Sequence, residues 1–178
     1  PLPREDLGAG GAAGGGVQTL MEELFDRLAV LGCPLLGWAG NKPPLARTHF
    51  SLPGAGGLVH ARQQFEDMAA AAAWLLEELG VEHGLTPAVV AATPPPAVAT
   101  ELLSTCQLAG LAGWEEAVAP RLKPTALRAG HGEAVCLLLG FLAGEALRRR
   151  RAAGALGVAL GYREDAGLEN APGDSDEE

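Results

Sequence analysis

The stretch Ala129-Gly130-His131-Gly132-Glu133-Ala134-Val135-Cys136 decides the fold, because it runs straight into an apolar segment that continues to Leu147. Its two glycines predict a tight turn, and Glu133 favours the positive end of a helix that starts there. The predicted helix, from Gly132 to about Arg151, carries apolar side chains on all its faces. Such a helix is typical of the buried centre of a helical bundle.

Three other segments have the apolar spacing of amphipathic helices, with apolar residues three and four positions apart. They cover residues 17–31, 61–79 and 97–109. Within the second, Ala69–Ala73 is a run of small side chains that would let another helix approach closely. Proline- and glycine-rich segments between them predict turns and loops, and no segment alternates as a strand would. The sequence therefore predicts an all-α fold.

One domain is expected, over residues 17–162, between a flexible glycine-rich leader over 1–16 and an acidic linker over 163–178. The net charge of −9 belongs mostly to that linker, because residues 164–178 hold seven of the 22 acids and no base. The rest has 15 acids against 13 bases. This excess of acids argues against nucleic-acid binding through the linker. Ser175 also lies in the linker, among acidic residues of the kind that acidophilic kinases favour. No apolar run reaches the length of a membrane span.

The chain offers no spacing typical of an active site or a metal centre. Its three cysteines are odd in number and far apart, which favours buried, reduced thiols over disulfides. None of the four histidines lies four residues from another. Glu133 invites a general-base interpretation, but an acid near a helix N-terminus is the commoner role. We therefore expect a protein that is not an enzyme and has no cofactor and no metal.

Two sets of residues are candidates for protein binding. Basic side chains flank the last predicted helix at opposite ends, about 30 Å apart for a helix of about 20 residues: Arg121, Lys123 and Arg128 before it, and Arg148, Arg149, Arg150 and Arg151 in its last turn. They could meet an acidic surface such as the tubulin tails, or they could simply be solvated charges that favour the helix dipole. The second set comprises aromatic residues in or beside loops, which are contact or core residues: Trp38, Phe50 and Trp114.

Several segments agree in order with a known family over roughly residues 17–178. They are Val17–Leu24, Arg47–Pro53, Gln63–Phe65, Ala72–Leu76, Gly130–Cys136 and Ala143–Leu147, followed by the acidic linker. In this order they resemble the N-terminal region of the intraflagellar transport protein 57 (Hippi) family. The chain departs from the family pattern at His131, where an aromatic residue is expected, and in the proline-rich loop at residues 93–96.

The resemblance implies a calponin-homology-like domain at the head of a coiled-coil protein, whose coiled coil does not lie within this sequence. It also implies a subunit of the intraflagellar transport B complex, which acts in cilium assembly at the cilium or flagellum and its basal body, on the cytoplasmic side. The expected partner of this domain is the large subunit, intraflagellar transport protein 172, and the absent coiled coil would pair with another subunit. We expect this part of the protein to be a monomeric docking domain, with direct tubulin or microtubule binding as the alternative.

Overall fold

The fold is all-α and forms one domain, as the computed structural model shows for residues 12–37, 42–57 and 59–154. These residues form seven α-helices and no β-strand, which confirms the predicted fold class. The proposed linker over 163–178 with Ser175, the first part of the proposed leader, and Trp38 lie outside the described residues.

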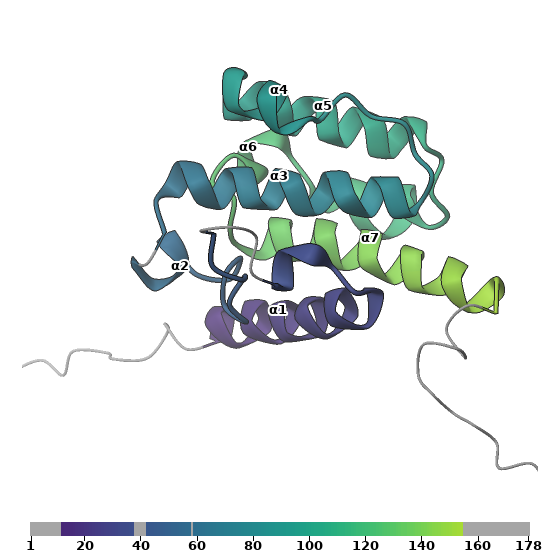
Figure 1. Cartoon of the computed structure of the whole chain (residues 1–178), viewed down its shortest axis with the longest axis horizontal. Helices are drawn as coiled ribbons and strands as arrows, with labels where there is room; N and C mark the ends of the chain where they lie inside the picture. The colour runs from purple at the N-terminus through teal and green to yellow at the C-terminus, as the bar shows by residue number, and fades with distance from the viewer. Residues whose placement is uncertain (1–11, 38–41, 58, 155–178) are drawn as a thin grey trace, which may run out of the picture.

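Four long helices make up most of the domain: α1 (Ala12–Leu31), α3 (Ala61–Glu78), α5 (Pro95–Leu108) and α7 (Glu133–Ala152). Helix α7 lies between α1 and α3 and contacts both, and α5 lies on the far side of α3 (Figure 1). Helix α7, the last in the described part of the chain, is therefore central, as its apolar sequence predicts. None of the described helices is long and apolar enough to cross a membrane.

Short helical elements connect the long ones. They are the 3₁₀ turns η1 (Pro34–Leu36) and η3 (Ala119–Arg121), the π-helical turn η2 (Trp114–Val118), and the short helices α2 (Gly54–Gly57), α4 (Pro87–Ala92) and α6 (Pro124–Leu127).

The core forms where the apolar faces of these helices meet. Met21, Leu24 and Leu28 of α1 are fully buried, and Leu138 and Leu142 of α7 are fully buried as well. The apolar side chains predicted for the 61–79 segment are also buried in α3 and at its end: Phe65, Met68, Ala72, Leu75, Leu76 and Leu79.

The structure differs from the sequence prediction at two helix starts. Helix α1 begins at Ala12 rather than Val17, so the end of the proposed leader is helical. Once the amphipathic part is packed, each further helical residue needs no new nucleus, which offsets part of the entropic cost of glycine. Helix α4 is not in the prediction, although its start has a clear signal: the Thr86 side chain caps it and Pro87 occupies the first turn.

The three cysteines are free and buried, as predicted. Burial raises the pKa of Cys106 and of Cys136 to about 12, and it also raises the pKa of Cys33. Because a thiol is nucleophilic only as the thiolate, all three act as small apolar core residues at neutral pH.

Candidate functional site

The arginine-rich end of α7 is the most basic part of the described surface, and the structure divides its arginines into two kinds. Two of them bind the ends of neighbouring helices. Arg149 Nη1 donates a hydrogen bond to the Leu79 carbonyl, at 2.6 Å, just past α3. Arg150 Nη1 donates to the Leu31 carbonyl, the last residue of α1, at 2.9 Å. Since the last carbonyls of a helix have no partner within it, these two arginines cap α3 and α1.

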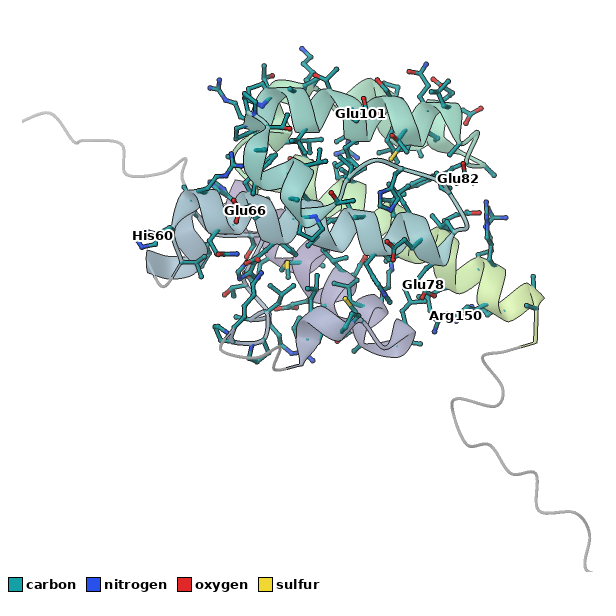
Figure 2. The ribbon with its side chains drawn as sticks, turned by 45° about the horizontal axis from the view of Figure 1, so that its top comes forward. His60, Glu66, Glu78, Glu82, Glu101 and Arg150 are labelled. Carbon is teal, nitrogen blue, oxygen red and sulfur yellow. The ribbon has the colours of Figure 1, made fainter. Side chains whose placement is uncertain are left out.

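Carboxylates hold the same arginines in place. Glu145 is buried, with only 7% of its side chain exposed, and it pairs with both Arg148 and Arg149 from one helical turn away. Glu78, at the end of α3, pairs with Arg150 (Figure 2). Two of the four predicted contact arginines, Arg149 and Arg150, therefore have a structural role that connects the ends of three helices.

The other two arginines line a groove beside α7. Arg148 and Arg151 form part of its rim, together with Arg27 of α1, and the cavity measures about 560 Å³. Gly140 and Gly144 line it from α7, and the Arg27 guanidinium lies over both, 3.6 and 3.7 Å from where their Cβ atoms would be. We call it the basic groove.

The basic groove has more basic than acidic side chains in its lining. Its lining carries three guanidinium groups against the single carboxylate of Glu145. Arg27 is fixed there, because its Nη1 donates to the Gly140 carbonyl at 2.8 Å while Glu23 lies 3.4 Å from its Nη2. Neither Arg148 nor Arg151 contacts a carbonyl of another helix among the hydrogen bonds of the described residues. Since Arg148 pairs with Glu145 and Arg27 with Glu23, Arg151 is the groove arginine without an ion pair in the described part of the chain, and it can bind a carboxylate.

The basic residues before α7 lie at its opposite end. Arg121 forms an ion pair with Glu133 at the start of α7, with 2.7 Å between Nη2 and Oε1. This contact gives Glu133 an electrostatic role at a helix N-terminus. Lys123 and Arg128 are exposed. The structure thus places the two predicted basic sets at opposite ends of α7, and Arg121 lines a smaller groove of about 360 Å³ with residues of α6 and α7.

The aromatic candidates are core residues where the structure describes them. Phe50 is fully buried and Trp114 is 3% exposed. Phe50 packs edge-on against His49, with 4.9 Å between ring centroids, and Trp114 packs against Phe141 at 5.6 Å. The proposed role of Phe50 and Trp114 as surface contacts is therefore wrong. The alternative, that they are core residues, agrees with their burial.

Segments that carry the family resemblance meet in one buried junction. The Gly132 amide donates to the Phe50 carbonyl at 2.7 Å, and the Cys136 thiol lies 3.6 Å from the same oxygen. Gly130 faces the backbone of Phe65, so closely that a Cβ there would lie 2.5 Å from the Phe65 Cα. Gln64 is fully buried and binds the same loop through its side chain. The residues of these motifs thus form buried contacts that join the loop at residues 47–53, helix α3 and the turn before α7.

A buried polar cluster beside this junction has no counterpart in the sequence prediction. Asp67 is 2% exposed and pairs with Lys42, while Gln63 donates to its Oδ1 at 2.9 Å. His49 Nε2 lies 2.9 Å from Asp67 Oδ2. Burial alone would raise the pKa of Asp67, but the contacts from His49, Lys42 and Gln63 outweigh it and hold the pKa below its usual range. The cluster fastens the 42–52 loop to α3.

No family model matches this chain, and no curated protein matches it either. Within the described residues, no three His, Cys, Asp or Glu side chains are grouped as metal ligands would be.

Proposed function

We propose that this chain is a non-enzymatic docking domain of an intraflagellar transport B subunit, with a calponin-homology-like fold, that binds the large 172 subunit during cilium assembly. The resemblance described above supports this proposal. It gains weight from the buried junction, because residues of Arg47–Pro53, Gln63–Phe65 and Gly130–Cys136, far apart in the chain, contact one another there. Because these three segments pack against one another, a change in one would disturb the others, which gives a physical reason for them to recur together in a family.

The basic groove is the observation that carries the docking role. Arg27 is held by its hydrogen bond to Gly140 and Arg148 by its ion pair with Glu145, so a partner would lose little entropy in ordering these two side chains. Arginine is also enriched among the residues that dominate binding energy at protein interfaces. The partner surface would be an acidic segment with carboxylates spaced to meet these guanidinium groups.

Direct tubulin binding is the second candidate, and the same groove favours it, since tubulin tails are acidic. The balance of charge over the described residues weakens it. Thirteen acids face eleven bases there, so long-range attraction to an acidic polymer is small. Docking to one defined acidic segment needs only the local groove.

Calorimetry of the purified chain with the large subunit, at low and high salt, tests the proposal. Saturable binding that weakens as salt rises is the expected result, because the contacts of the groove are charge-assisted. Absence of binding at both salt concentrations would contradict it. Co-sedimentation with microtubules under the same conditions would then support the second candidate.

A further inference from the structure

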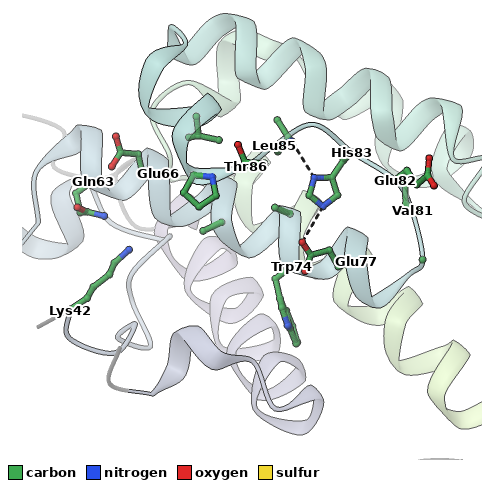
Figure 3. A pocket seen from close by; sticks show the side chains of 15 residues that line it. Lys42, Gln63, Glu66, Trp74, Glu77, Val81, Glu82, His83, Leu85 and Thr86 are labelled. Carbon is green, nitrogen blue, oxygen red and sulfur yellow. Dashed lines mark hydrogen bonds and ion pairs between the residues drawn. The ribbon is translucent and has the colours of Figure 1, made fainter. Parts of the chain in front are cut away.

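A larger groove of about 950 Å³ runs along α3 and shares no lining residue with the basic groove. Residues 81–90 form its second wall, and Figure 3 shows this segment beside α3. Ala70 and Ala73 line the α3 side, where their small side chains leave a depression, and Leu85 and Val90 line the facing side. We call it the α3 groove.

Hydrogen bonds fix the facing wall. The Leu85 amide donates to His83 Nδ1 at 3.2 Å, and the Val89 amide donates to Thr86 Oγ1 at 3.3 Å. Arg62 reaches across from α3, where its Nη2 donates to the Val90 carbonyl at 2.6 Å. The wall is therefore held in place without a ligand, and a partner would find the groove already formed.

Charge in the α3 groove is uneven along its length. At one end, charges of opposite sign cancel, because Lys42 pairs with Asp67 and Glu66 pairs with Arg62 at 2.8 Å. The other end carries Glu77 and Glu82.

These two carboxylates have no lysine or arginine partner in the described part of the chain. No lysine or arginine there forms an ion pair with Glu77 or Glu82, and both are exposed. The nearest basic group to Glu77 is His83, whose Nε2 lies 3.7 Å from Glu77 Oε1 (Figure 3). This end of the groove is complementary to a cationic group.

We propose that the α3 groove binds an amphipathic helix of a partner protein, with apolar side chains over Ala70 and Ala73 and two Arg or Lys residues at the end over Glu77 and Glu82. Three turns of α3, about 16 Å, separate Glu66 from Glu77, which suits a partner helix of similar length. This inference does not rest on the proposed function and concerns a different surface.

The chain's own acidic segment does not fit this groove. Residues 164–178 hold seven acids and no base, so like charges would repel it from Glu77 and Glu82. A second copy of the chain could offer basic residues such as Arg148 and Arg151 or Lys123 and Arg128, and sedimentation of the chain alone tests for that occupant.

The test uses a 16-residue helical model peptide with leucines on one face and two arginines near one end. Its matched control has glutamine in place of both arginines. Each peptide is titrated into the wild-type chain and into the E77Q/E82Q variant by calorimetry at low salt. These glutamates are exposed, and Glu77 has 69% of its side chain accessible, so glutamine should not perturb folding.

Two exposed ion pairs predict that E77Q/E82Q binds the arginine peptide about 2- to 30-fold more weakly than wild type. The glutamine peptide should lose the same factor on wild type. Combining both changes should cost no more than either alone, because both remove the same pairs. The control variant E115Q/E116Q, which removes two exposed acids of η2 outside the groove, should bind the arginine peptide as wild type does.

Three results would overturn the proposal: no saturable binding of the arginine peptide, equal affinity of wild type and E77Q/E82Q, or an equal loss in E115Q/E116Q. Sedimentation of the chain alone covers the remaining occupant. If the wild-type chain associates as its concentration rises and E77Q/E82Q does not, a second copy of the chain occupies the α3 groove. That result would contradict binding of a partner helix. The double variant R148E/R151E changes the basic groove and leaves the α3 groove intact. It should bind the arginine peptide as wild type does, so failure of this proposal can be told apart from failure of the proposed function.

Discussion

Replacing Gly130 with alanine is the sharpest perturbation of the buried junction. Gly130 has a φ of +71°, and a Cβ there would lie 2.5 Å from both the Cα and the amide nitrogen of Phe65. The left-handed conformation costs about 1–2 kcal/mol for alanine. The clash is with helix backbone, which cannot rotate away, and overpacking of this kind costs about 1–3 kcal/mol. We therefore expect a loss of about 2–5 kcal/mol in the free energy of unfolding.

Gly110→Ala is the matched control. Gly110 has a φ of +59°, but a Cβ there would meet no atom within 4 Å. It should lose only the conformational term, so the difference between the two variants isolates the close approach of the turn to α3. Urea denaturation of wild type and both variants measures this difference, with an expected value of about 1–3 kcal/mol. Equal destabilisation of the two variants would refute the packing of the 129–136 turn on α3.

Three further predictions test the polar and thiol groups. Arg150→Ala should lose about 1–3 kcal/mol of stability in urea denaturation, because it leaves a helix end uncapped, whereas Arg151→Ala should stay within about 0.5 kcal/mol of wild type. The pKa of Asp67 is lowered in the folded protein. Its contribution to stability is therefore present above its unfolded pKa of about 4 and is lost as pH falls through its folded pKa. Asp67→Asn should be less stable than wild type at pH 7 and should show a weaker dependence of stability on pH below pH 4, as circular dichroism would measure. Cys106 and Cys136, with pKa values raised to about 12, should react with a thiol reagent at pH 8 only after unfolding, and fast labelling of the native protein would contradict their burial.

Apolar spacing predicts most of this fold because each long helix buries one continuous face. The 61–79 prediction matches α3 at Ala61–Glu78, and the helix predicted from Gly132 to Arg151 matches α7 at Glu133–Ala152. Helix α4 is short and has one buried residue, Val90, so periodicity cannot reveal it. Its Thr-Pro start was the available signal.

The candidate site could be predicted only in part. Sequence identifies Arg148–Arg151 as a basic cluster, but the separation of Arg149 and Arg150 from the other two depends on where α1 and α3 end in space. The same holds for Phe50, whose burial depends on the return of α7 past the loop. Asp67 gave no signal, because a charged residue within a helical segment is usually solvated.

Charge reversal at the basic groove tests the docking role most directly. R148E/R151E changes the two rim arginines that do not cap another helix, and K123E/R128E makes an equal change in charge at the opposite end of α7. After circular dichroism has shown both variants folded, their affinity for the large intraflagellar transport subunit is compared with that of wild type. We expect R148E/R151E to weaken binding at least about 10-fold, because reversed charges repel an acidic partner, and K123E/R128E to bind as wild type does. Unchanged affinity of R148E/R151E would contradict the basic groove as the docking surface.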